Sequence, residues 1–281
     1  MLGPLLVLIP LGVIWLDEWL AARAGVRGAV FTLFMLAIGI VAAREITKIF
    51  RARKIVSSFR LNAAMVALGL LASSMTTSEL GGVSGVAMIC SVAAGVLLIA
   101  LLYYSRGKNV EGVVASAAAT LLAFVYVGLM GGFVILIQKE FSGWVMLAVI
   151  LVTKCCDIGA YALGRSIGRH KLIPWLSPGK TWEGFFGGVV SSAVAGLVAV
   201  WLAESPVSGV QHLQWWHGLV LGAVFGAVGQ AGDLVASLLK RDAGMKDYSR
   251  AIPGFGGVMD LADSPLLVAP VAYWLLKILS A

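Results

Sequence analysis

Charged residues are scarce in this chain of 281 residues, since Asp, Glu, Lys and Arg together make up only 12% of it. A soluble globular domain is about 25% charged and about 45–50% apolar. This chain is 60% hydrophobic and has a mean hydropathy of +0.95. The composition therefore excludes an ordinary soluble domain and indicates an integral membrane protein. We expect the net charge of +7 to face anionic lipid, and we exclude nucleic acid as a partner.

Cysteine is also rare, and its placement excludes two common uses. The three cysteines, Cys90, Cys155 and Cys156, all fall inside apolar runs. An odd number leaves no complete disulfide framework, and the spacing is not that of a zinc site. We expect all three to be buried as small hydrophobic side chains.

Continuous apolar runs are abundant. A spanning helix needs about 20 mostly apolar residues, whereas the strands of a membrane β-barrel would show short alternating segments. We predict an all-α fold, a polytopic integral membrane protein with about nine transmembrane helices. The runs lie near residues 2–16, 28–43, 61–76, 82–104, 113–137, 143–163, 185–203, 216–238 and 263–279. No Lys or Arg precedes the first run, as it would in a signal peptide, so we expect that helix to be retained.

The distribution of basic residues predicts the orientation. With the N-terminus in the cytoplasm, most Lys and Arg residues fall in the inside loops 44–60, 164–184 and 239–262. The first of these loops is basic and partly amphipathic, which favours an interfacial helix on anionic lipid. We divide the chain into N-terminal transmembrane helices, 1–112, and a C-terminal transmembrane region, 113–281, that holds the other two cytoplasmic loops.

Four aspartates lie within the predicted spans or at their ends: Asp157, Asp233, Asp260 and Asp263. In the predicted topology all four lie toward the cytoplasmic side. A carboxylate at membrane depth is costly unless it is paired, hydrated or bound to a metal. An ion pair with Lys154, three residues earlier on the helix, is the structural alternative for Asp157. Together the four indicate a polar pocket at the inner leaflet.

Asp233 and Asp260 have no basic residue three or four positions away on their own helices. Instead each is followed four residues later by a serine, Ser237 or Ser264. A carboxylate in that setting is expected to hold a cation or a partner from another helix, and oxygen ligands select a hard cation such as Mg²⁺. We predict a metal-binding or catalytic role for both, and a second, monovalent or divalent cation is an open alternative.

Basic side chains and glycines flank these carboxylates. They are Lys180 before the seventh span, Lys240, Arg241 and Lys246 after the eighth, and Gly256 and Gly257 before the ninth. Lysine complements phosphate, and glycine lets backbone N–H groups approach an anion closely. Anchoring at the membrane surface is the simpler alternative. The combination with the carboxylates favours a lipid head-group enzyme that performs phosphoryl or nucleotidyl transfer.

The stretch 237–263, "SLLKRDAGMKDYSRAIPGFGGVMDLAD", resembles the C-terminal signature of phosphatidate cytidylyltransferases, also called CDP-diacylglycerol synthases. The positions in register are Ser237, Lys240, Arg241, Lys246, Asp247, Pro253, Gly256, Gly257, Asp260 and Asp263. Gly232 and Asp233 also match. The segment 157–188, with "DIGAYALGRSIGRHKL" and "SPGKTWEGFFGG", is similar to a second conserved block of that family. The N-terminal half resembles the family only in being a set of spans.

Two positions depart from this signature. Phe255 stands where the family has His in the glycine loop, and Leu261 stands where it has Arg after the aspartate. A subgroup in which other residues such as Arg250 supply these contacts, an altered substrate, and lost activity are the alternatives.

The resemblance implies that CTP and phosphatidate react to give CDP-diacylglycerol and pyrophosphate. It implies a multi-pass enzyme of the cell membrane, the inner membrane in bacteria, with a cytoplasmic active site and commonly a homodimer. The implied catalytic residues are Asp233, Asp260, Lys240 and Lys246, with magnesium at the two aspartates. The implied substrate-binding residues are Asp157, Ser177, Lys180, Glu183, Arg241, Asp247, Gly256, Gly257 and Asp263. The rival functions are a CDP-archaeol synthase, a polyprenol kinase and, from another class, an ion or solute transporter.

Overall fold

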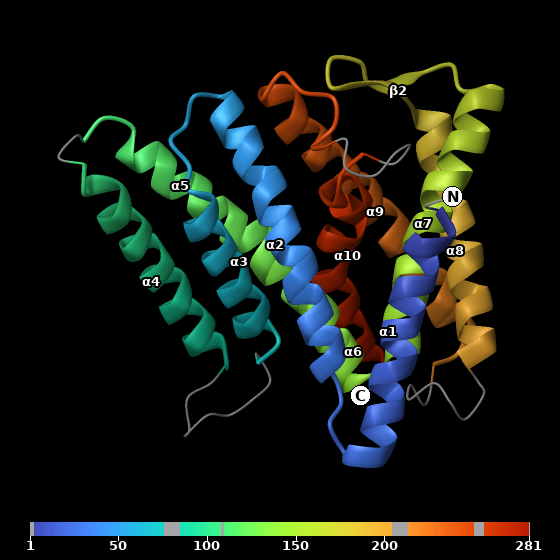
Figure 1. The fold of residues 1–281 in the computed structure, drawn as a ribbon. Coiled ribbons are helices and arrows are strands. Elements are labelled where there is room, and N and C mark those ends of the chain that lie inside the picture. Colours follow the sequence, from blue (N-terminus) through green and yellow to red (C-terminus); the bar gives the residue numbers. More distant parts are fainter. Residues whose placement is uncertain (1–2, 76–84, 108–109, 204–212, 250–255, 281) are drawn as a thin grey trace. The chain divides into compact units, whose positions relative to one another are not determined.

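A computed structural model describes residues 3–75, 85–107, 110–203, 213–249 and 256–280, and almost all of them are helical (Figure 1). The helices are α1 (Gly3–Ala24), α2 (Ala29–Ala52), α3 (Phe59–Ser73), α4 (Gly85–Ser105), α5 (Val113–Ala123), the π-helix η1 (Phe124–Leu129), α6 (Met130–Glu140), α7 (Gly143–Ile167), α8 (Trp182–Ala203), α9 (Trp215–Asp242) and α10 (Val258–Leu279). Helices α5, η1 and α6 follow one another without a break. A short antiparallel hairpin, β1 (Lys171–Ile173) and β2 (Ser177–Thr181), lies between α7 and α8.

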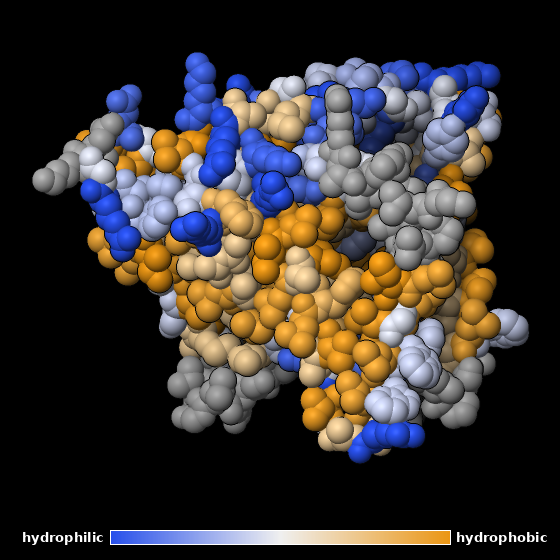
Figure 2. Space-filling view, viewed as in Figure 1, coloured by the Kyte–Doolittle hydropathy of each residue, from blue (hydrophilic) through white to orange (hydrophobic). Residues whose placement is uncertain are grey.

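Seven of the described segments are long and apolar enough to cross a membrane: α2, α4, the rod from α5 to α6, α7, α8, α9 and α10. Helix α3 is apolar but has only 15 residues. Large apolar side chains such as Leu102 on α4 and Trp201 on α8 point outward, and Figure 2 shows apolar residues over the sides of the helices. The prediction of an all-α polytopic membrane protein is confirmed. The number of nine spans and the cytoplasmic N-terminus stay predictions.

The four helix ends that border the loops 164–184 and 239–262 differ from the predicted spans. Helix α7 continues to Ile167 and α9 to Asp242, whereas α8 begins at Trp182 and α10 at Val258. An apolar run marks only the part of a helix that lies in lipid, and a helix continues where water solvates its charged side chains. Asp260 therefore lies in the first turn of α10 instead of in a loop.

Two predictions about side-chain environment are wrong. The segment 44–60 is not a separate interfacial helix, because α2 runs unbroken to Ala52 and buries one face that includes Ile46 and Phe50. Cys90 is exposed on α4 and Cys155 is half-buried, so only Cys156 is buried within the protein. An exposed position on a spanning helix faces lipid, where a small hydrophobic side chain needs no protein partner.

The chain forms two compact units. The first comprises Met1–Leu136 and Asp242–Leu261, and the second comprises Ile137–Arg241 and Ala262–Ala281. The predicted division at residue 112 was a division by function and stays a prediction. In the first unit a buried cluster joins α3, α4, α5 and η1: Leu61, Met65, Val96, Ala100, Ala117 and Phe124.

Glycines set the packing of the second unit. Gly159 of α7 lies against α8, Gly196 of α8 lies against Gly222 of α9, and Gly232 of α9 lies against the backbone of α10. A Cβ at any of these positions would collide with the facing helix. In lipid, helices gain little hydrophobic free energy from association, so close backbone contact supplies the attraction. This close packing brings polar groups on α7, α9 and α10 near one another.

Candidate active site

The second unit joins its hairpin to α9 through an ion pair. The ammonium of Lys180, in β2, lies 2.8 Å from a carboxylate oxygen of Asp233 on α9. It also donates a hydrogen bond of 3.3 Å to the backbone carbonyl of Gln230. The two charged side chains are 20% and 33% exposed, so solvent reaches both. Lys180 and Asp233 were both predicted as site residues. The structure brings them together although they come from segments about 50 residues apart.

A second lysine lies inside a span, between two predicted carboxylates. The ammonium of Lys154 on α7 is 3.1 Å from Asp157 and 3.8 Å from Asp263 of α10. The ion pair considered for Asp157 is therefore present, and the same lysine also neutralises Asp263, which is 6% exposed. Asp233 and Lys240 also act electrostatically on Asp263. Because charges of both signs converge here, the cost of each carboxylate at membrane depth is reduced.

The close approach of the α9 and α10 backbones determines where the charged side chains of this cluster lie. At Gly232 a Cβ would lie 2.8 Å from the backbone carbonyl oxygen of Asp263, so only glycine lets α9 and α10 come this close. Three residues earlier, a Cβ at Gly229 would lie 2.8 Å from the side-chain methyl group of Thr153 on α7. Helix α9 therefore meets both α7 and α10 within about one turn of Asp233.

Gln230 supports this cluster, and the sequence analysis did not select it. Its side chain is buried on α9, and its amide donates to the backbone carbonyl of Phe185 at 3.4 Å and to the sulfur of Cys156 at 3.5 Å. The backbone carbonyl of Gln230 accepts the hydrogen bond from Lys180. Gln230 thus connects three helices behind the ion pair of Lys180. An amide in an apolar span, three residues before Asp233, was the available signal.

The hairpin carries Ser177 and Lys180 on the same strand. Ser177 pairs with Ile173 across the hairpin. Glu183, in the first turn of α8, accepts hydrogen bonds from the backbone N–H of His170, and its carboxylate lies 2.6 Å from the Nδ1 atom of that ring. Glu183 therefore closes the base of the hairpin. The substrate-binding roles of Ser177 and Glu183 stay predictions.

In the first unit, Asp260 lies in the first turn of α10 and contacts the segment that precedes this helix. Its Oδ2 atom accepts hydrogen bonds from the backbone N–H groups of Tyr248 at 3.0 Å and Gly257 at 2.9 Å. Gly256 has a φ of 86°, and a Cβ there would lie 2.6 Å from the same carboxylate oxygen. Glycine is required at this position both for its backbone and for space. The predicted contact of these glycines with phosphate stays a prediction.

Glu45 is a second acidic residue in this part of the first unit, and it was not among the residues predicted from the sequence. It lies on α2 and is only 2% exposed. Its two carboxylate oxygens accept hydrogen bonds from the backbone N–H of Val258 at 3.1 Å and of Met259 at 2.8 Å. Its partners follow 213 and 214 residues later in the chain, so no local pattern could identify them.

The other predicted residues of the 239–262 loop are more open. Arg241, Lys246 and Asp247 are exposed, and Lys240 is half-buried. Arg250, Pro253 and Phe255 lie outside the described residues. The roles of this loop in binding phosphate therefore stay predictions.

The carboxylates fit magnesium by their chemistry. Asp233 and Asp260 offer only oxygen donors, and Mg²⁺ in proteins is usually held by one or two carboxylates together with water and substrate phosphates. In the described part of the chain no group of three or more His, Cys, Asp or Glu side chains could hold a metal ion. A cation at either aspartate would thus complete its coordination with water or substrate. The two aspartates belong to different units, so their sharing of one cation stays a prediction.

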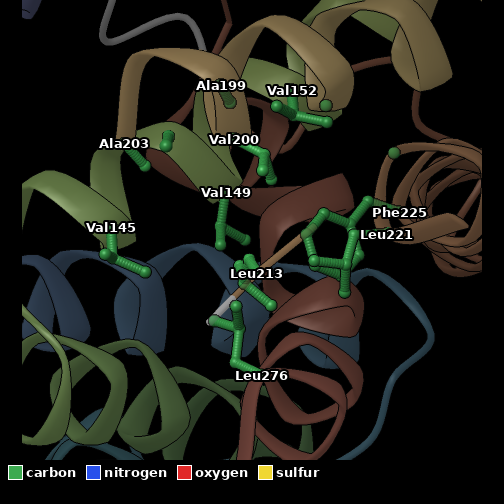
Figure 3. Close-up of a pocket in the computed structure, with 13 residues that line it drawn as sticks. Val145, Val149, Val152, Ala199, Val200, Ala203, Leu213, Leu221, Phe225 and Leu276 are labelled. Carbon is green, nitrogen blue, oxygen red and sulfur yellow. The ribbon is translucent and has the colours of Figure 1, made fainter. Parts of the chain in front are cut away.

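An apolar groove lies among α7, α8, α9 and α10 in the second unit (Figure 3). It has about 460 Å³ of empty space, counting the part open to its surroundings. Its lining includes Val145, Val149, Val152, Ala199, Val200, Leu221, Phe225 and Leu276. Along α7 the lining runs from Val145 to Val152, roughly 10 Å. Lys154 follows Val152 two residues later in the sequence of α7.

Comparison with known proteins gives consistent matches over both units. The model of the cytidylyltransferase family matches residues 7–279. A phosphatidate cytidylyltransferase of Staphylococcus saprophyticus is 30% identical over 245 residues, which are 87% of this chain and 88% of that protein. The one of Bacillus subtilis is 31% identical over 252 residues, 89% and 90% of the two chains. The one of Mycobacterium tuberculosis is 37% identical over 163 residues, 57% of this chain and 47% of that protein. The family match thus includes the N-terminal helices.

Proposed function

Because this chain belongs to the cytidylyltransferase family, we propose that it performs the reaction for which its relatives are named, the cytidylylation of phosphatidate by CTP. A phosphate oxygen of phosphatidate attacks the α-phosphorus of CTP. The bond from that phosphorus to the oxygen that bridges it to the β-phosphorus breaks, and pyrophosphate leaves with CDP-diacylglycerol as the other product. The main support is that one unit holds both the charged cluster of Lys154, Lys180, Asp233 and Asp263 and an apolar groove, because the reaction joins an anionic nucleotide to a lipid.

In this proposal the lysines of the cluster bind the reacting phosphates. Magnesium at Asp233 and Asp260, when bound, neutralises phosphate charge. Lys180 donates to a phosphate of CTP from the place where it now contacts Asp233. Lys154, held between Asp157 and Asp263, orients the phosphate of the lipid.

The remaining assigned groups have supporting roles in this proposal. Positive charge for the leaving pyrophosphate comes from Lys240, Arg241 and Lys246. The supporting polar groups are Ser177, Glu183, Asp247 and the backbone of Gly256 and Gly257.

We also propose the finer topology, with nine transmembrane segments that include α1 and α3. The N-terminus and the loops 164–184 and 239–262 then face the cytoplasm, where CTP is found. The concentration of Lys and Arg in these loops supports this orientation. The homodimer rests on the family resemblance alone.

The apolar groove gives the lipid substrate a place for one acyl chain. No water is available in the hydrocarbon region to fill it, and all the residues that line it are apolar. With the lipid phosphate at Lys154, an acyl chain that follows α7 would pass Val152, Val149 and Val145 in turn. The groove therefore favours long-chain substrates over short ones.

The test uses the purified full-length protein in detergent with phosphatidate, Mg²⁺ and CTP labelled at either the α- or the γ-phosphate. We expect the α-label in CDP-diacylglycerol and the γ-label in pyrophosphate. A polyprenol kinase would place the γ-label in a polyprenol, and a CDP-archaeol synthase would prefer an ether-linked isoprenoid lipid phosphate. No labelled CDP-diacylglycerol, under conditions where the Bacillus subtilis relative forms it, would refute the proposal.

A further inference from the structure

The start of α10 is held by a carboxylate from a distant helix. Glu45 of α2 accepts hydrogen bonds from the backbone N–H groups of Val258 and Met259, one at each of its oxygens. The first four N–H groups of any helix have no partner within the helix, and the positive end of the helix dipole favours an anion there. Glu45 therefore acts as a cap supplied from elsewhere in the chain.

The contact requires the adjacent glycine. A Cβ at Gly257 would lie 2.5 Å from one carboxylate oxygen of Glu45 and 2.6 Å from the other. Any side chain at 257 would thus push Glu45 away from the first turn of α10. The fit between the glycine and the carboxylate fixes where the helix begins.

The same glycine contacts the predicted metal ligand. The N–H of Gly257 donates to the Oδ2 atom of Asp260, while its Cα faces Glu45. Gly257 is therefore held by two carboxylates, that of Glu45 from α2 and that of Asp260 from within α10. A shift of Glu45 would change the turn at 256–259 and with it the direction of the Asp260 side chain.

We propose that Glu45 is a positioning residue that orients Asp260 for the divalent cation, and that it thereby sets the affinity for that cation. The inference rests on the proposed function, in which Asp260 is a magnesium ligand. Glutamine in place of Glu45 keeps the shape but offers one oxygen acceptor and one NH₂ group that cannot accept a hydrogen bond. Glu45→Gln thus loses one of the two hydrogen bonds and the charge.

Asp17 provides a matched control in the same unit. It is also fully buried, and it caps α2 through hydrogen bonds from the N–H groups of Gly28 at 2.8 Å and Val30 at 2.9 Å. Asp17→Asn therefore removes the same kind of buried cap at the start of α2, about four helical turns before Glu45 and in a helix that does not carry Asp260. Both variants are expected to lower the melting temperature.

The experiment measures Mn²⁺ binding by electron paramagnetic resonance in the full-length protein, together with the Mg²⁺ concentration that gives half-maximal formation of CDP-diacylglycerol. For Glu45→Gln we expect Mn²⁺ binding to weaken and the Mg²⁺ requirement to rise by about tenfold, the loss of roughly one hydrogen bond to a charged group. For Asp17→Asn we expect both values to stay as in the wild type. Equal effects in the two variants, or an unchanged cation affinity in Glu45→Gln, would overturn the proposal.

A second variant covers the case in which Glu45→Gln does not fold. Glu45→Asp keeps the charge but is one methylene shorter, so it cannot reach both N–H groups, and we expect the same direction of change with a smaller magnitude. Wild-type affinity for Mn²⁺ in that variant would contradict the proposal. If the wild type binds Mn²⁺ but forms no CDP-diacylglycerol, the proposed function fails, whereas the Mn²⁺ comparison still decides the role of Glu45.

Discussion

Replacing Lys180 with glutamine should lower kcat/KM for CTP far more than it lowers stability. The ammonium of Lys180 makes one charge-assisted contact of 2.8 Å with Asp233 and is well placed to exchange it for a phosphate oxygen. A hydrogen bond to a charged group contributes about 1.5–3 kcal/mol, which corresponds to roughly 10- to 150-fold in kcat/KM. The loss of the ion pair itself should cost at most about 1 kcal/mol of stability, because both side chains are partly exposed and screened by solvent.

The control is Lys171→Gln, which removes the same charge from an exposed residue on the first strand of the same hairpin. Initial rates of CDP-diacylglycerol formation over a range of CTP concentrations give kcat/KM, and thermal unfolding in the same detergent gives the melting temperature. We expect Lys171→Gln to retain the wild-type kcat/KM. If the two variants differ by less than about twofold in kcat/KM, Lys180 does not bind the phosphates of CTP and the reasoning from its ion pair is wrong.

Three further outcomes are expected. Asp233→Asn and Asp260→Asn should each lower turnover by roughly 100-fold or more, because an amide is a weaker ligand than a carboxylate for a hard cation. Circular dichroism should show that both variants stay folded. Near-normal turnover in either variant would show that the substituted aspartate is not a metal ligand. A chelator should abolish turnover and added Mg²⁺ should restore it, and activity that persists in the chelator would contradict a magnesium requirement. Ala199→Phe should fill the apolar groove and lower the preference for long-chain over short-chain phosphatidate by about tenfold, because the ring displaces about two methylene groups worth about 0.8 kcal/mol each. Val198→Phe, on the exposed side of α8, should leave this preference unchanged, and equal effects of the two substitutions would show that the groove holds no acyl chain.

The sequence predicted those features that depend only on residues close together in the chain. Long apolar runs predicted the helices, because lipid leaves the backbone few alternatives. The spacing of Lys154 and Asp157 on one helix predicted their possible pairing, and the structure shows it. The extension of α7 and α9 beyond their apolar runs was missed, because a helix in water needs no apolar pattern.

Contacts between distant segments could not be predicted. The burial of Gln230 among three helices depends on how close glycines let those helices pack. Glu45 appeared to belong to a basic surface segment, and only its contact with α10 gives it a structural role. A resemblance based on the C-terminal half gave no reason to look for a partner of Asp260 in the N-terminal half.

The long separation between Glu45 and the start of α10 has a consequence for biosynthesis. At about 5–20 residues per second, a ribosome needs about 10–40 s to make the 213 residues that lie between this carboxylate and its first partner. During that time Glu45 must be protonated, hydrated or bound by another partner, because an uncompensated carboxylate is not stable in an apolar environment. The first unit can close only after nearly the whole chain has been made. A chain that ends before residue 258 would leave this carboxylate without the two backbone N–H groups that it caps in the complete protein.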